Sequence, residues 1–102
     1  MVKKQNKSMQ KRYIIAYDIS KNKNRKKVSD LLVQYGIRSN FSVFECLLDP
    51  GKLNEIMTKI EFLISSQTDR VLIYPVCRNC FMKSKYLGNQ PDSIDKTEIK
   101  IV

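Results

Sequence analysis

Asp18 is the residue whose type and surroundings most suggest a catalytic or metal-binding role. It follows the apolar stretch YIIAY, and five of the nine residues from Ile19 to Lys27 are Lys or Arg. The chain has no histidine, so acid–base or metal chemistry near neutral pH must use carboxylates, tyrosines, lysines or cysteines. In a structural alternative, Asp18 only accepts hydrogen bonds from backbone amides at the start of a helix.

A metal site at Asp18 needs a second contribution. Mg²⁺ in proteins is usually held by one or two carboxylates together with water and substrate phosphate, so a single carboxylate is a weak site. A two-fold axis near the end of this first strand would bring two copies of Asp18 together. The ion, a bound water and basic groups would then suffice for phosphodiester hydrolysis. Asp18 is therefore the candidate metal ligand, and Mg²⁺ or Mn²⁺ is the candidate cofactor.

Positive charge is concentrated in the first quarter of the chain. Residues 1–27 hold ten Lys or Arg and one acid, whereas residues 28–102 hold nine of each sign. This distribution is typical of a nucleic-acid-binding surface, although a basic tail with a solvated helix face would give the same count. The candidate phosphate-binding residues are Lys21, Lys23, Arg25, Lys26 and Lys27.

Length and composition exclude several classes of protein. A chain of 102 residues forms one domain. No apolar run approaches the roughly 18 residues of a membrane span, and the N-terminus is polar, so we expect a cytoplasmic protein. Three cysteines argue against a disulfide framework. Cys77 and Cys80 have metal-like spacing but supply half of a tetrahedral zinc site, so simple thiols are favoured over a Cys₄ site shared by two chains.

Residues 13–36 predict a strand followed by a helix. The β-branched and aromatic residues from Tyr13 to Ile19 are typical of a strand, and both of its faces are apolar. Ser20 or Asn22 can cap the helix, and Gly36 can end it. The apolar residues at helical spacing are Val28, Leu31, Leu32 and Tyr35.

Residues 37–77 predict two further strands, a second helix and a last strand. A short strand runs from Ile37 through a turn near Asn40 into a longer strand that ends at Leu48. The DPG sequence that follows predicts a helix with aspartate as cap and proline at the first position. Residues 69–77 are the last strand, and Pro75 places it at a sheet edge. The apolar side of the second helix is Leu53, Ile56, Met57, Ile60, Leu63 and Ile64.

The element order βαββαβ folds most simply as an α+β, ferredoxin-like sandwich with two helices on one face of a four-stranded antiparallel sheet. We expect residues 1–12 to be a disordered basic tail, residues 13–90 the domain, and residues 91–102 an added C-terminal strand on its own or a partner's sheet. Because the first strand is apolar on both sides, the open face needs a cover. A second copy of the chain is the simplest one, so we expect a homodimer.

Four segments of the chain carry a resemblance to a known family: YIIAYDIS, GIRSNFSVFECLL, VCRNC and TEIKIV. Their most specific parts are Tyr17-Asp18-Ile19, Gly36-x-Arg38 and Ser42-Val43-Phe44-Glu45. Together they closely resemble the CRISPR-associated family of small proteins that partner the spacer integrase in adaptation, known as CRISPR-associated endoribonucleases. The resemblance covers residues 13–102, with one departure at Asn40-Phe41, where members usually have a glutamine.

The resemblance implies a homodimer in which the first-strand aspartate of each protomer, here Asp18, faces the other across a cleft. It implies that Tyr17, Arg25, Arg38 and Phe44 join Asp18 at positions associated with nuclease activity in some members. Some members are metal-dependent RNases or DNases, whereas others act as the scaffold between two integrase dimers. The implied function is a subunit of the adaptation complex that binds duplex DNA, with RNA as the alternative nucleic acid. Because members differ in this respect, the resemblance is compatible both with a subunit that has Mg²⁺-dependent endonuclease activity and with one that lacks it.

Two other functions are compatible with this fold. An RRM-type nucleic-acid-binding module has the same element order, but its aromatic signature is absent and it gives Asp18 no purpose. A stand-alone toxin-like ribonuclease is the third candidate, which the neighbouring genes would separate from the first. Four aromatic residues could stack on bases, although aromatic residues in strands are more often part of the core. They are Tyr13, Tyr17, Phe41 and Phe44.

Overall fold

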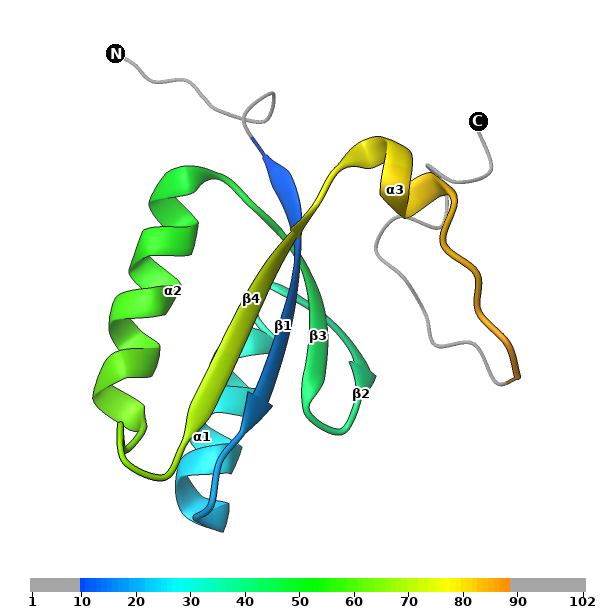
Figure 1. Cartoon of the computed structure of the whole chain (residues 1–102). Helices are drawn as coiled ribbons and strands as arrows, with labels where there is room; N and C mark the ends of the chain where they lie inside the picture. The colour runs from blue at the N-terminus through cyan, green and yellow to red at the C-terminus, as the bar shows by residue number, and fades with distance from the viewer. Residues whose placement is uncertain (1–9, 89–102) are drawn as a thin grey trace.

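A computed structural model describes residues 10–88, which form one antiparallel sheet and three helices (Figure 1). The strand order in the sheet is β2-β3-β1-β4, and all three strand pairs are antiparallel. The predicted α+β class and βαββαβ order are confirmed. The elements are β1 (Lys11–Asp18), α1 (Asn22–Leu32), β2 (Gly36–Asn40), β3 (Val43–Leu48), α2 (Pro50–Leu63), β4 (Arg70–Val76) and α3 (Arg78–Met82).

The hydrophobic core lies between the sheet and helices α1 and α2. Met57 was expected there but is 40% exposed. That expectation is wrong because Ile56 and Ile60 point inward, and each step along a helix turns by about 100°, which carries Met57 towards solvent. The buried core residues are Ile15, Tyr17, Ile19, Val28, Leu31, Leu32, Phe44, Cys46, Leu48, Ile56 and Ile60.

Both ends of α1 differ from the prediction. The N-cap residue is Lys21, whose side chain makes no capping hydrogen bond, so neither Ser20 nor Asn22 is the cap. The helix ends at Leu32, and Gly36 begins β2 instead of stopping the helix. A Cβ on Gly36 would lie 2.2 Å from a backbone oxygen of β3. The glycine is therefore needed for close strand pairing.

The start of α2 and the edge position of β4 are as predicted. Asp49 caps α2, and its Oδ1 accepts a hydrogen bond from the Lys52 amide at 2.8 Å. Pro50 is the first helical residue. Among the strands of residues 10–88, β4 pairs only with β1, so the missing N–H of Pro75 can face away from the ladder.

The helix α3 was not predicted, and it lies beside the sheet away from α1 and α2 (Figure 1). Its Phe81 is buried against the guanidinium of Arg12, whose central carbon is 3.9 Å from the ring centroid. Farther along, Tyr86 donates a hydrogen bond to Glu45 of β3. Burial, with help from Glu45, raises the pKa of Tyr86 to about 12. This C-terminal part of the domain therefore covers one end of the sheet face that the other two helices leave open.

The two closely spaced cysteines form the start of α3. Cys77 is its N-cap, and its Sγ accepts a hydrogen bond from the Cys80 amide at 3.3 Å. Both thiols are exposed, whereas Cys46 is buried. Burial raises the pKa of Cys46 to about 11, while the Cys80 amide holds the pKa of Cys77 below its usual value. The spacing of Cys77 and Cys80 is thus explained by the hydrogen bond with which Cys77 caps the helix.

The uncovered part of the open face is apolar. On β4, Leu72 and Tyr74 are 44% and 52% exposed. Their register partners on β1, Ala16 and Ile14, are partly exposed on the same face. The predicted C-terminal strand over residues 91–102 lies outside the described residues, and the homodimer stays a prediction. No helix within residues 10–88 could span a membrane.

Candidate functional site

A cavity of about 610 Å³ opens where β1 ends and α1 begins. The β1–α1 junction and the β2–β3 turn meet at this end of the sheet, so residues far apart in sequence line one space. We call it the Asp18 cavity. It brings together Asp18, Tyr17, Arg25, Lys26 and Arg38 of the predicted site. Its other lining residues are Ile19, Asn22, Ser29, Asp30, Phe41 and Ser42.

The structural alternative for Asp18 was that it accepts hydrogen bonds from backbone amides at the start of the helix. Within residues 10–88, Asp18 does not do this. Asp69 has that role: its Oδ1 accepts from the Ser20 amide at 3.0 Å and its Oδ2 from the Ser65 amide at 2.8 Å. These bonds, that to Ser65 foremost, lower the pKa of Asp69. Asp18 is exposed, and within residues 10–88 no hydrogen bond or ion pair engages its carboxylate. Its oxygens are therefore available to a ligand.

Replacing Asp69 should loosen the junction that shapes the cavity, and the effect should depend on pH. In Asp69→Asn one carboxylate oxygen becomes an NH₂ group, which cannot accept from a second amide. Because the folded-state pKa of Asp69 lies below the unfolded value near 3.9, its stabilisation is complete above that value and is lost as the pH falls through the folded-state pKa.

Thermal melts of the wild type and Asp69→Asn between pH 7 and pH 2 measure this effect. The difference in melting temperature should be largest near neutral pH and should close in acid. Glu61→Gln, at an exposed position on α2, is the control and should show no such gap. A difference that stays constant over the whole pH range would contradict the assignment.

Arg25 braces the loop between β1 and α1. Its Nε donates to the Ile19 carbonyl at 3.2 Å, its Nη2 to the Ser20 carbonyl at 3.3 Å, and its Nη1 to Asn22 Oδ1 at 2.5 Å. A guanidinium has five N–H donors, so two remain for an anion in the cavity. Arg25 therefore holds the loop after Asp18 in shape and can still bind phosphate.

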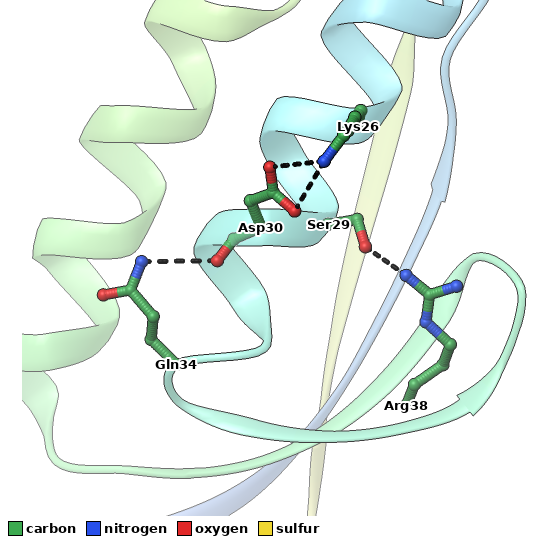
Figure 2. Close-up of polar contacts among 5 residues, drawn as sticks. All are labelled: Lys26, Ser29, Asp30, Gln34 and Arg38. Carbon is green, nitrogen blue, oxygen red and sulfur yellow. Dashed lines mark hydrogen bonds and ion pairs between the residues drawn. The ribbon is translucent and has the colours of Figure 1, made fainter.

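Arg38 and Lys26 are held by side chains of α1 (Figure 2). Arg38 donates from Nη2 to Ser29 Oγ, and the Nζ of Lys26 lies 3.1 Å from Asp30 Oδ2. Gln34 donates to the Asp30 carbonyl at 3.3 Å. Asp30 and Ser29 were not predicted as site residues. The i,i+4 spacing of Lys26 and Asp30 was the available signal, because such residues are neighbours on a helix.

Tyr17 and Phe44 support the site from the core. Tyr17 is 6% exposed, and its Oη donates to the Phe41 carbonyl at 3.3 Å. Phe44 is fully buried and does not line the Asp18 cavity. Its ring centroid is 6.4 Å from that of Tyr17 and 5.3 Å from the guanidinium carbon of Arg38. These two residues therefore position the turn and the arginine.

The structure divides the five basic residues predicted at the helix start into two sets. Arg25 and Lys26 line the Asp18 cavity, whereas Lys21, Lys23 and Lys27 are exposed outside it. We call the latter three the flanking lysines. Helix α1 has no acidic residue in its first turn and no side-chain cap. Cations beside the positive end of a helix dipole repel it, so an anion bound there would relieve the repulsion.

The donors in the Asp18 cavity fit a hard cation only in part. A carboxylate oxygen is a ligand that Mg²⁺ and Mn²⁺ prefer. Within residues 10–88 no group of three or more His, Cys, Asp or Glu side chains could hold a metal. Within the described residues of this cavity, one protomer therefore offers Asp18 as the carboxylate without a partner, and water, substrate phosphate or a second protomer can supply further ligands.

The fold and the site define a small ferredoxin-like protein with an acidic residue and several cations at the end of its first strand. Residues 9–84 match the family described as CRISPR associated protein Cas2. The chain belongs to this family, so the resemblance seen in the sequence is confirmed. A curated relative, CRISPR-associated endoribonuclease Cas2 3 of Synechocystis, is 38% identical over 79 residues, which are 78% of this chain and 86% of the relative.

Two solved structures support the same assignment. The crystal structure of Streptococcus pyogenes Cas2 has a TM-score of 0.70 and 28% identity, and the match covers 76% of this chain and 99% of that one. A chain of a partial Cas6-RT-Cas1–Cas2 complex has a TM-score of 0.66 and 28% identity, with 79% and 94% covered.

Proposed function

We propose that this protein is the Cas2 subunit of a cytoplasmic CRISPR adaptation complex, a homodimer that binds duplex DNA and bridges two dimers of the integrase Cas1 during spacer acquisition. The observation that carries the proposal is the Asp18 cavity, in which one unengaged carboxylate lies among Arg25, Lys26 and Arg38. The similarity to a chain from a complex that contains Cas1 supports the choice of partner.

The open face of the sheet supports the dimer. Asp18 alternates with Ile14 and Ala16 along β1, so it belongs to the same face as these apolar residues. Its register partner on β4 is Arg70. A second copy packed on this face would bury Leu72 and Tyr74 and would bring the two Asp18 side chains near one axis.

Duplex binding in this proposal rests on phosphate contacts. The flanking lysines are exposed beside the cavity and have no partner within residues 10–88, so they are free to contact a DNA backbone. Contacts of this kind hold a duplex without reading its sequence. This suits a subunit that must accept fragments of any sequence.

Nuclease activity is the finer part of the proposal. Asp18 and its copy in the second protomer would together hold a Mg²⁺ or Mn²⁺ ion near the dimer axis, with water and substrate phosphate as the other ligands. Such an ion lowers the pKa of its bound water and neutralises charge on the phosphate. Arg38 and Lys26 would bind the neighbouring phosphates, while Arg25 keeps the loop after Asp18 in place. We place the scaffold role first, because the cations of the cavity serve it with or without a metal.

The RRM-type alternative loses support from the sheet. In that module, aromatic side chains on the open face stack on bases. Here the open-face positions of β1 and β3 are aliphatic or charged, with Ile14, Ala16, Val43 and Leu47 among them.

Reconstitution with the integrase of the same locus tests the proposal. The full-length chain should be a dimer by light scattering and should elute with Cas1 in one complex. Integration of a duplex fragment into an array should require both proteins. A stable monomer, or integration that proceeds equally well without this chain, would contradict the proposal and favour a stand-alone ribonuclease.

A further inference from the structure

The cap of α3 explains one of its two exposed thiols but not the other. Cys77 caps the helix through a hydrogen bond from the backbone amide of Cys80, and any residue except proline supplies such an amide. The cap therefore accounts for the spacing but not for a thiol at position 80. Sulfur is also a weak acceptor, and the residues that usually cap helices are Ser, Thr, Asp and Asn. A cysteine at both positions therefore points to sulfur chemistry.

The two thiols are close enough to act together. Both are exposed, and their side chains are hydrogen bonded to each other. The Cys80 amide, followed by the Cys80 thiol, lowers the pKa of Cys77. The same contact with Cys77, together with its negative charge, raises the pKa of Cys80. Thiol–disulfide exchange needs this arrangement, in which one sulfur ionises readily and attacks while a neighbouring thiol stays protonated until it resolves the product.

Cys77 also lines a second large cavity, which we call the Cys77 cavity. It has a volume of about 700 Å³ and lies where β1 begins and β4 ends, at the opposite end of these two strands from the Asp18 cavity. Its cations are Lys11, Arg12 and Arg78, and most of its other lining residues are apolar. None of the described residues that line it is acidic. The cavity therefore favours a negatively charged molecule beside the Cys77 sulfur.

The charges of the Cys77 cavity select the kind of molecule that reacts with this sulfur. Such a reactant must present sulfur to Cys77 and negative charge to Lys11 and Arg78. Small disulfides of the glutathione class do both, because each half carries carboxylates as well as sulfur. Carboxylates pair with Lys and Arg, and cations beside a thiol also favour its reactive thiolate.

We propose that Cys77 and Cys80 form a redox site that small anionic disulfides oxidise and the corresponding thiols reduce again. The inference is independent of the proposed function, because it uses neither the Asp18 cavity nor DNA. A Cys77–Cys80 disulfide would add a covalent bond across the first turn of α3, the helix whose Phe81 packs against Arg12.

Oxidation proceeds in two exchange steps. The Cys77 thiolate attacks one sulfur of the small disulfide, which breaks that S–S bond, forms a mixed disulfide on Cys77 and releases one small thiolate. The Cys80 sulfur, after losing its proton, then attacks the Cys77 sulfur, which releases the second small thiolate and closes the Cys77–Cys80 disulfide. Two electrons pass to the small disulfide, and the protons of the two cysteines end on the two small thiols.

Single-cysteine variants of the full-length protein, treated with oxidised glutathione and analysed by mass spectrometry, test the two roles. Cys80→Ser should accumulate a mixed disulfide with one glutathione per chain. Cys77→Ser keeps a good cap residue and should gain this adduct at least about ten-fold more slowly. The wild type should lose only the mass of the two thiol hydrogens, and peptide mapping should join Cys77 to Cys80. The buried Cys46 is the internal control and should remain a thiol.

The charge of the disulfide tests the Cys77 cavity. Each oxidation rate is divided by the rate for a small free thiol with the same disulfide. The wild type should then prefer anionic oxidised glutathione to neutral hydroxyethyl disulfide by about ten-fold or more at low salt, and about 1 M salt should reduce this preference. Arg78→Gln should reduce it too, whereas Lys59→Gln, which removes the same charge from α2, should not.

Three results would each overturn the proposal. The first is equal adduct rates in Cys77→Ser and Cys80→Ser, and the second is a disulfide between chains in place of the internal one. The third is the absence of a preference for the anionic disulfide, or a preference that Lys59→Gln reduces as much as Arg78→Gln does. None of these results depends on DNA or Cas1, so failure here leaves the proposed function intact.

Discussion

Asp18→Asn should abolish metal-dependent cleavage while the protein still folds, dimerises and binds duplex DNA. The Asp18 side chain is exposed, and within residues 10–88 it makes no hydrogen bond or ion pair that the substitution could remove. Asparagine has nearly the same shape but lacks the charge that holds Mg²⁺ or Mn²⁺. Loss of a group that only orients a metal ligand typically costs about 10–100-fold in activity or affinity, so loss of the ligand itself should cost more.

Three measurements on the purified Asp18→Asn variant separate the metal site from the scaffold. Mn²⁺ affinity and the rate of metal-dependent cleavage should both fall by more than about a hundred-fold, while duplex affinity stays unchanged. Glu61→Gln removes a carboxylate from α2, outside the Asp18 cavity, and should leave all three intact. Undiminished cleavage would remove Asp18 from the site. If Asp18→Asn still folds but no longer supports integration with Cas1, the enzymatic role is more important for adaptation than the scaffold role.

The parts of the fold that sequence predicts here depend on local patterns. The apolar run of β1, the spacing of Val28, Leu31 and Leu32, and the Asp49-Pro50 cap each lie within a few residues, and each gave the right element. The helix α3 has only five residues, too few for any periodicity to show. Its Phe81 packs against Arg12, and this contact joins parts of the chain that are far apart in sequence.

The lining of the Asp18 cavity was predictable to a similar degree. The family resemblance identified Asp18, Arg25 and Arg38, which the fold brings into one cavity. No local pattern could show that Asp69 binds the Ser20 amide, because 49 residues separate them. Sequence spacing also could not separate Phe41 from Phe44, although one is almost fully exposed and the other is fully buried. That difference depends on the turn between β2 and β3.

Replacing the flanking lysines should weaken duplex DNA binding strongly and make it less sensitive to salt. The triple variant of Lys21, Lys23 and Lys27 to Ala leaves the brace made by Arg25 intact, so the loop after Asp18 should keep its shape. Each surface contact of this kind is worth up to about 1 kcal/mol, so affinity at low salt should fall about ten-fold to a hundred-fold. Each phosphate contact contributes about one unit to the salt slope, so the slope should fall by up to about three units.

A second triple variant, of Lys52, Lys59 and Lys83 to Ala, distinguishes contacts at α1 from the effect of overall charge. It removes the same number of charges from the formal net charge of +9, but two of these lysines lie on α2 and the third follows α3. Long-range attraction depends on the total charge and falls off beyond the Debye length, which is about 10 Å at 0.1 M salt. The α1 variant should therefore lose much more affinity than this control at 0.1 M salt. Equal losses would assign DNA binding to the net charge of the protein and would leave the flanking lysines without a specific role.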